Sequence, residues 1–109
     1  MAEGVQKVDN TSFAAEVEQY KGTVLVDFSA TWCPPCRILG PIIEEVSQAV
    51  AGRAKVLALD VDESGDTASR FYVLNVPTMI FFKNGKEVRR LVGVTPKEKI
   101  IEQINELAK

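Results

Sequence analysis

Apolar residues occur in two patterns along the chain: unbroken runs, which are typical of buried strands, and residues three or four apart, which are typical of helices. Residues 22–30 (GTVLVDFSA) and 54–62 (AKVLALDVD) are apolar runs rich in β-branched residues, which predict strands buried on both faces of a sheet. Helical spacing follows the first run from Pro34 onward, and after the second run residues 63–74 have the composition of a loop and a short helix that ends near Leu74. Strand, helix, strand, helix is the order of a βαβ unit.

A helix is also predicted over residues 11–20, with Asn10 or Thr11 available as its cap. Its apolar positions at helical spacing are Phe13, Ala14, Val17 and Tyr20. In the helix that follows the first buried run, Pro41 interrupts the pattern and predicts a kink.

The last third of the chain predicts an antiparallel hairpin. Residues 78–83 and 86–93 have the composition of strands, and an Asn84-Gly85 pair separates them. Asn-Gly supplies the two positive φ angles of a type I′ turn, which joins strands of opposite direction.

The final residues, 95–109, predict the most regular helix of the chain. Thr95 is the expected N-cap, Pro96 the first helical residue, and apolar side chains follow on one face. Taken together, the elements predict an α/β fold in which a mixed central sheet lies between helices on both faces.

Composition and charge narrow the class of protein. With 109 residues, of which 46% are hydrophobic, the chain is long enough for one domain over residues 1–109 and too short for two. The net charge of −2 gives no basic excess for nucleic acid. The N-terminus holds no apolar run of signal-peptide length, and no run approaches the ~18 apolar residues of a membrane span. We therefore expect a soluble, cytoplasmic monomer that binds neither nucleic acid nor membrane.

The two cysteines lie in the sequence TWCPPCR, residues 31–37, with Pro34 and Pro35 between them. A bridge across two residues closes too small a loop to stabilise a fold, and thiols stay reduced inside cells, so the pair points to reactivity. Cys33 falls where a buried strand ends and a helix begins, and free amides and the helix dipole there favour a thiolate. We expect Cys33 to be the exposed nucleophile. Cys36, on the same side of the first turn, would attack the mixed disulfide and resolve it.

Two other interpretations of the cysteine pair are half of a zinc site and two incidental buried thiols. Zinc binds about four ligands. The chain has no histidine and no further cysteine, so a zinc site would need a dimer or carboxylates. The βαβ context favours redox chemistry through a Cys33-Cys36 disulfide, with no metal and no separate cofactor.

Asp27 is a carboxylate within the apolar run of residues 22–30, where an unpaired charge is costly. Burial would raise its pKa, and from its position six residues before Cys33 it could accept the proton of Cys36. The alternative is an aspartate that points out of the sheet or pairs with a lysine.

Pro77, in the sequence NVPTMIF, stands just before the predicted strand 78–83. A cis bond at this proline would expose the preceding carbonyl group, whereas an ordinary trans proline would only open the strand. The residues alone leave both possibilities open.

Three stretches, in this order, resemble the thioredoxin family over essentially the whole chain. They are VDFSATWCPPCR, which is similar to the family's Asp-Phe-x-Ala-x-Trp-Cys-Gly-Pro-Cys stretch, NVPT, which is similar to its cis-proline loop, and FFKNGKEV, which is similar to its hairpin. The resemblance implies the thioredoxin fold, with Cys33 as the attacking and Cys36 as the resolving cysteine. Asp27 corresponds to the buried proton acceptor and Pro77 to the cis-proline. The implied substrate-binding surface around the nucleophile consists of Trp32, Val76, Pro77, Gly93 and Val94.

The same resemblance implies a general protein disulfide reductase. Its dithiol would reduce disulfide-bearing proteins and be restored by a flavoenzyme of the thioredoxin reductase type, which uses NADPH or, in some lineages, ferredoxin. Two rival functions remain, a thiol oxidase or disulfide isomerase on the same fold and a non-catalytic assembly subunit. An export signal would support the first, and the intact cysteine pair argues against the second.

The sequence departs from the family at two positions near the site. Pro34 replaces the usual glycine and, beside Pro35, leaves the amide of Cys36 as the nearest donor for the thiolate. We expect the two prolines to tune the reduction potential, although weaker thiolate stabilisation and a stiffer turn act in opposite directions and leave the sign open. Ala58 stands where many bacterial members carry a lysine, so Asp27 would lack a cationic neighbour.

Residues 60–66 (DVDESGD) imitate the first half of a calcium-binding loop. Position twelve of such a loop would be Phe71 rather than glutamate, so a solvated loop is the better interpretation.

Overall fold

The protein, as a computed structural model that describes residues 4–109, is built on a five-stranded sheet with strand order β1-β3-β2-β4-β5. The elements in chain order are β1 (Val5–Lys7), η1 (Ala14–Glu18), β2 (Thr23–Ser29), α1 (Pro34–Ala49), β3 (Lys55–Asp60), α2 (Gly65–Arg70), β4 (Thr78–Lys83), β5 (Lys86–Val92) and α3 (Lys97–Leu107). Strands β1, β3 and β2 pair in parallel, whereas β4 is antiparallel to β2 and to β5. The sheet is therefore mixed, as predicted.

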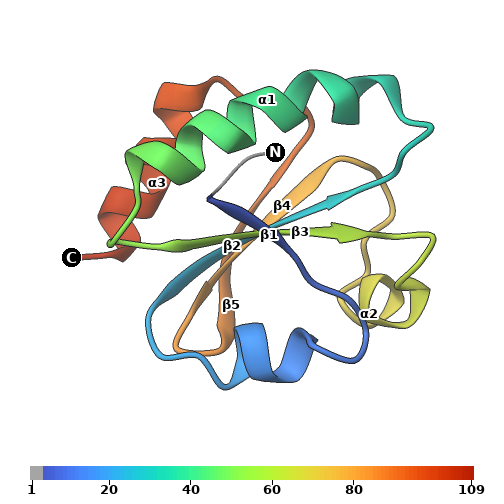
Figure 1. The fold of residues 1–109 in the computed structure, drawn as a ribbon, viewed down its shortest axis with the longest axis horizontal. Helices are drawn as coiled ribbons and strands as arrows, with labels where there is room; N and C mark the ends of the chain where they lie inside the picture. The colour runs from blue at the N-terminus through green and yellow to red at the C-terminus, as the bar shows by residue number, and fades with distance from the viewer. Residues whose placement is uncertain (1–3) are drawn as a thin grey trace.

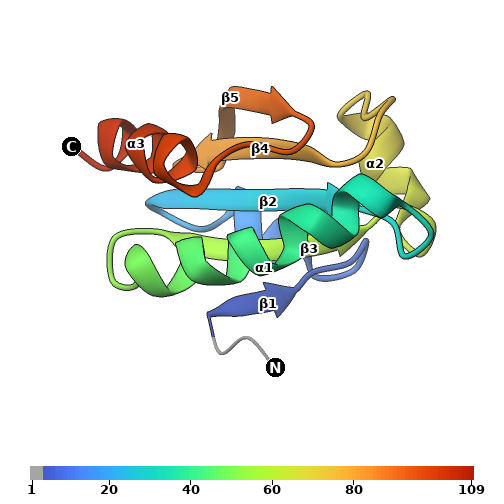
Figure 2. The ribbon, with the colours of Figure 1, turned by 90° about the horizontal axis from the view of Figure 1, so that it is seen from above.

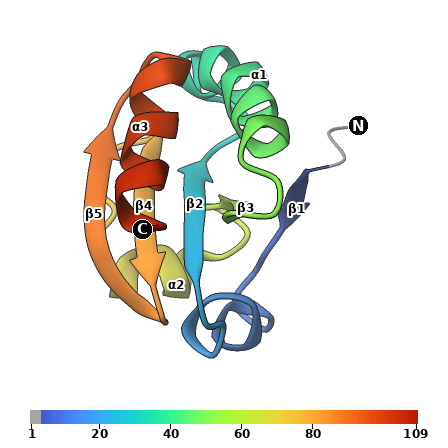
Figure 3. The same cartoon turned by 90° about the vertical axis from the view of Figure 1, so that its left-hand side faces the viewer.

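Helices cover both faces of this sheet. Helices α1 and α3 lie together on one face, and the short helices η1 and α2 lie on the other (Figures 1 and 3). Figure 2 shows the five strands side by side beneath α1 and α3. The predicted α/β fold with a mixed sheet between helices is confirmed. None of the helices in residues 4–109 is long and apolar enough to cross a bilayer.

Strand β2 is buried on both faces because its side chains alternate between two cores. Val24, Val26 and Phe28 belong to the core under η1 and α2. Leu25 belongs to the core under α1 and α3, and the β2 residues two and four places further on face the same way. Asp27 therefore lies on the α1 face of the central strand, close to the end where α1 begins.

The hairpin is confirmed by its turn. Asn84 and Gly85 have φ angles of 51° and 85°, the two positive values that a type I′ turn requires. Strand β1 was not predicted, since its three residues carry no strand pattern of their own. It forms because Val5–Lys7 pair with β3 in parallel register.

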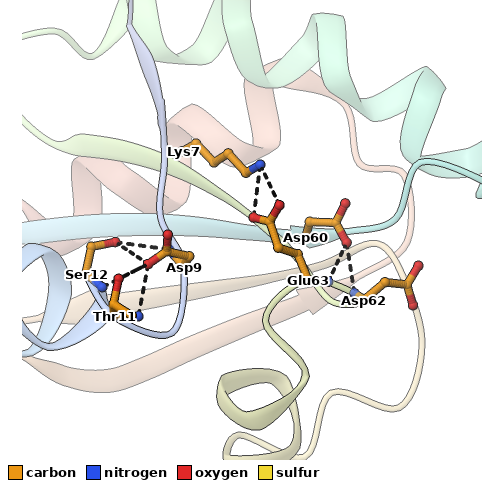
Figure 4. Close-up of polar contacts among 7 residues, drawn as sticks. All are labelled: Lys7, Asp9, Thr11, Ser12, Asp60, Asp62 and Glu63. Atoms are coloured by element: carbon orange, nitrogen blue, oxygen red, sulfur yellow. Dashed lines mark hydrogen bonds and ion pairs between the residues drawn. The ribbon is translucent and has the colours of Figure 1, made fainter.

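The predicted helix over residues 11–20 is wrong in length, type and cap. Only Ala14–Glu18 are helical, as a π-helix whose C-cap amide at Gln19 donates to the carbonyl of Ala14. The N-cap of this helix is Phe13 and no side chain caps it, whereas the Asp9 carboxylate accepts the amides of residues 11 and 12 at 2.9 and 3.0 Å in the turn before the helix (Figure 4). The side chain of Asn10 instead accepts hydrogen bonds from Thr67.

Other helix ends also differ from expectation. Helix α2 stops at Arg70 rather than near Leu74, because Tyr72 adopts a positive φ of 55° that ends the helical path. Pro96, not Thr95, is the N-cap of α3, and the Thr95 hydroxyl donates to the carbonyl of Gly93. Helix α1 runs through Pro41 as one continuous element.

Candidate active site

The two cysteines lie at the junction of β2 and α1, where the strand ends at Ser29 and the helix begins at Pro34. Their sulfurs form a disulfide, with the Cα atoms of Cys33 and Cys36 5.2 Å apart. Cys33 is the N-cap of α1, and its Sγ accepts a hydrogen bond of 3.2 Å from the amide of Cys36. The helix N-terminus thus directs a donor at the first sulfur, as the sequence pattern predicts.

The expectation that Cys33 is exposed is wrong for this state of the protein. Only 2% of Cys33 and 7% of Cys36 are accessible to solvent. The reason is packing, because Val61 and Val76 lie against the small cluster formed by the two cysteines and Ala30. The carbonyl oxygen of Val76 is 3.6 Å from the Sγ of Cys33. This carbonyl group therefore borders the Cys33 side of the disulfide.

Pro34 and Pro35 occupy the first two positions of α1 and are exposed. An N-cap side chain accepts hydrogen bonds from the N–H group of the second or third helical residue. These residues are Pro35 and Cys36 here, and proline has no N–H group to donate. The first helical position is one at which proline costs no useful donor. Pro35 is therefore the residue whose missing N–H group would have reached Cys33. Pro34 removes an N–H group that would not have reached it, so its effect on the Cys33 sulfur is smaller than its place in the motif predicts.

Asp27 is buried, with 4% of its surface accessible, and its Oδ1 has no hydrogen-bond partner among the described residues. Burial raises its pKa from 3.8 to about 7. Asp27 and Cys36 line the same cavity, of about 320 Å³. The Cα atom of Asp27 is in register with that of Ala58 on β3, so the residue directly opposite it on this strand carries no charge.

The residues expected to receive substrate lie around the disulfide in a connected series. The Val76-Pro77 peptide bond is cis, and the carbonyl of Pro77 accepts a hydrogen bond of 2.8 Å from the amide of Gly93. Gly93 has a φ of 92°, which favours glycine at this position. Trp32 and Val94 are exposed beside them, whereas Pro77 itself is buried.

Trp32 is held by the loop after β3. Its indole N–H donates a hydrogen bond of 2.7 Å to the carboxylate of Asp62. The same loop is tied to its own backbone, since the Asp60 carboxylate accepts the amides of Asp62 and Glu63, and Glu63 pairs with Lys7 (Figure 4). Among residues 4–109, no group of three or more histidine, cysteine or acidic side chains is placed to hold a metal ion. The carboxylates of this loop instead serve as caps and ion pairs.

Comparison with known proteins decides the family. The family model described as Thioredoxin matches residues 4–106. Thioredoxins of the Staphylococcus aureus strains Mu50 / ATCC 700699, MW2 and N315 are each 43% identical over 101 residues, which is 93% of this chain and 95% of theirs. The chain belongs to the thioredoxin family. The expected thioredoxin fold is confirmed, and the chain is a thiol-disulfide oxidoreductase with protein-disulfide reductase activity.

Several residues at this thioredoxin-family site were not predicted from the sequence. Asp62 was assigned to a solvated loop, and Val61 and Glu44 were not singled out. One signal was available, because neighbouring parallel strands end at the same edge of a sheet, which places the loop after β3 beside the loop after β2. For Glu44, which lines the cavity of Asp27, helical spacing was a signal, because Cys36, Gly40 and Glu44 are four residues apart and share one face of α1.

Proposed function

We propose that Cys33 and Cys36 reduce substrate disulfides by two successive exchange steps. The Cys33 thiolate attacks a substrate sulfur, a mixed disulfide forms and the first substrate thiolate leaves. Cys36 then loses its proton and attacks the Sγ of Cys33, which releases the second substrate thiolate and closes the Cys33-Cys36 disulfide. Two electrons pass to the substrate. The hydrogen bond from the Cys36 amide to the Cys33 Sγ supports this order, because it favours the thiolate on the first cysteine.

Asp27 is the proposed acceptor of the Cys36 proton. The observation that carries this role is the shared cavity, since Asp27 and Cys36 both line it. Burial keeps the pKa of Asp27 near 7, so that the carboxyl group can both take and return a proton at neutral pH. The chain has no histidine that could do this instead.

The proposed substrate surface consists of Trp32, Val76, Pro77, Gly93 and Val94. The carbonyl oxygen of Val76 lies 3.6 Å from the Sγ of Cys33, the reacting sulfur. A substrate chain lying against Val76 would bring its disulfide to Cys33 while its own amide meets this carbonyl. The exposed faces of Trp32 and Val94 would supply apolar contact on either side.

The remaining parts of the proposal concern the protein as a whole. Residues 1–109 act as one domain and as a monomer in the cytoplasm, where they carry electrons to disulfide-bearing proteins. A flavoenzyme of the thioredoxin reductase type regenerates the dithiol. The Cys33-Cys36 disulfide is the only redox group required, and neither nucleic acid nor membrane is a partner. Pro34 and Pro35 adjust the reduction potential.

Trapping of intermediates tests the roles of the two cysteines. Cys36→Ser should accumulate a mixed disulfide through Cys33 with a disulfide-bearing substrate such as insulin, whereas Cys33→Ser should accumulate none. Intact-protein mass spectrometry counts the adduct, and addition of dithiothreitol should release it. Adducts of equal yield on both variants would overturn the assigned order.

Asp27→Asn should slow the resolving step without abolishing adduct formation, and an unchanged rate above pH 8 would remove Asp27 from the mechanism.

A further inference from the structure

The cavity beneath the disulfide has the composition of a small binding site. Its volume is about 320 Å³, at the lower end of the roughly 300–1,000 Å³ typical of sites for small ligands. Most of its wall is apolar. The lining residues come from β1, β2, α1 and β3 and are Val5, Asp27, Ser29, Cys36, Gly40, Pro41, Ile43, Glu44 and Ala58.

The two carboxylates of this cavity accept hydrogen bonds and are not balanced by a positive charge, and Ser29 adds one hydroxyl group. Asp27 is 4% exposed, and its Oδ1 finds no hydrogen-bond partner among residues 4–109. Glu44, half-buried on α1, contributes a second carboxylate. Lys7, whose Cα is in register with that of Ala58, donates to Glu63 outside the cavity. A buried acceptor without a donor is costly, so a ligand that donates would be stabilised here.

We propose that this cavity binds a small primary alkylammonium ion, whose N–H groups donate to Asp27 and Glu44 and whose alkyl chain packs on the apolar wall. Val5, Ile43 and Ala58 would contact the alkyl chain. An ammonium group suits the site because it has three donors and no acceptor, and because its charge complements two carboxylates. The side chain of Ala58 is a single methyl group, which leaves the space over Asp27 open.

Binding of such a cation must depend on pH, because Asp27 attracts the cation only when its carboxyl group is ionised. The titratable groups that face Asp27 across the cavity are Glu44 and, in the dithiol form, Cys36, both on α1. The strands around Asp27 present Val5 and Ala58 toward the cavity and Met79 in register on β4, none of which titrates, and Lys7, two residues after Val5 on β1, pairs with Glu63. The pKa of Asp27, raised to about 7 by burial, sets the pH range over which the affinity changes. As the pH rises toward this value, the affinity should increase about tenfold per pH unit, and at higher pH it should level off.

The test is a titration of the oxidised protein, labelled with ¹³C at its carboxyl groups, with n-butylammonium chloride at constant ionic strength. We expect a saturable shift of the Asp27 and Glu44 carboxyl resonances whose midpoint follows the predicted pH dependence. 1-Butanol, which has the same alkyl chain without the charge, should bind at least about tenfold more weakly. Equal affinity for the alcohol, or the absence of a saturable shift, would overturn the proposal.

Variants locate the site. Asp27→Asn should lose most of the affinity for butylammonium, and Glu44→Gln should lose less. Glu45→Gln is the matched control, because Glu45 is the next residue on α1 but is exposed and pairs with Lys97. Ala58→Leu fills the cavity without changing either carboxylate and should also block binding. Full affinity in Asp27→Asn or in Ala58→Leu would place the cation elsewhere and refute the site.

Discussion

The amide of Cys36 donates a hydrogen bond of 3.2 Å to the Sγ of Cys33 across the first turn of α1. In many N-caps the amide one position earlier can contribute a second such bond, but here that position is Pro35. The thiolate of the reduced protein is therefore held by fewer donors than the helix could provide. The two prolines between the cysteines should therefore differ in their effect on the Cys33 thiolate, because only Pro35 stands where an amide could donate to it.

Pro35→Ala should lower the pKa of the Cys33 thiol, because it adds a donor at the second helical position. A hydrogen bond to a charged group contributes about 1.5–3 kcal/mol, so the pKa should fall by about one to two units. Pro34→Ala is the matched control, since the first helical amide does not reach the N-cap side chain. Thiolate absorbance near 240 nm during a pH titration of the reduced proteins measures the pKa of the Cys33 thiol in both variants. Equal shifts in the two variants would contradict this account.

Asp27 should make the oxidised protein less stable as the pH rises. Its pKa is about 7 in the folded protein and 3.8 in the reference state, so the folded form holds the proton more tightly. The contribution of Asp27 to stability is greatest below pH 3.8, falls between pH 3.8 and 7, and has lost on the order of 4 kcal/mol above pH 7. Asp27→Asn should remove this dependence and be the more stable protein at pH 8.

Urea unfolding of wild type and Asp27→Asn between pH 4 and pH 8 checks this expectation. Asp66→Asn, which removes an exposed carboxylate, serves as the control and should keep the wild-type pH dependence. If the difference between wild type and Asp27→Asn stayed constant over this range, Asp27 would not be the group responsible.

The sequence predicted those features that depend on local patterns. Residues 22–30 became β2 because an apolar, β-branched run suits a central strand, and Asn84-Gly85 formed its turn because the pair tolerates positive φ. The carboxylate within the run was recognised as buried for the same reason. These inferences needed no knowledge of distant contacts.

What could not be predicted depends on contacts between distant residues. β1 exists only because β3 offers it a partner, and the first helix was misjudged because the Asp9 carboxylate holds the amides of residues 11 and 12 in a turn before it. The burial of Cys33 follows from Val61 and Val76, which approach from two other loops. Local spacing could not predict either approach.

Asp62 should position Trp32 for substrate binding. Trp32 is 62% exposed, and its indole donates to the Asp62 carboxylate, so removal of the acceptor frees the ring. One hydrogen bond of this kind contributes about 0.5–1.5 kcal/mol, so Asp62→Ala should raise KM by about two- to tenfold and leave kcat nearly unchanged. The emission of Trp32, the only tryptophan of the chain, should change with it.

Two further variants separate positioning of Trp32 from a general effect on the loop. Asp62→Asn keeps an acceptor oxygen and should restore most of the wild-type KM. Glu63→Ala breaks the ion pair with Lys7 in the same loop and should leave KM unchanged. A KM for Asp62→Asn as high as that of Asp62→Ala would mean that the charge of Asp62, and not its hydrogen bond, matters.

Gly93 should be sensitive to substitution through its backbone alone. Its φ is 92°, and a Cβ added there would meet nothing within 4 Å, so Gly93→Ala introduces strain without a clash. Strain at such a φ costs on the order of 1–3 kcal/mol, and the urea midpoint should fall accordingly. The hydrogen bond from the Gly93 amide to the Pro77 carbonyl should weaken too, so KM should rise.

Gly65→Ala is the control, since Gly65 has equally open space and no positive φ, and this variant should be neutral or slightly stabilising. Similar losses in both variants would show that side-chain volume, and not φ, limits these positions.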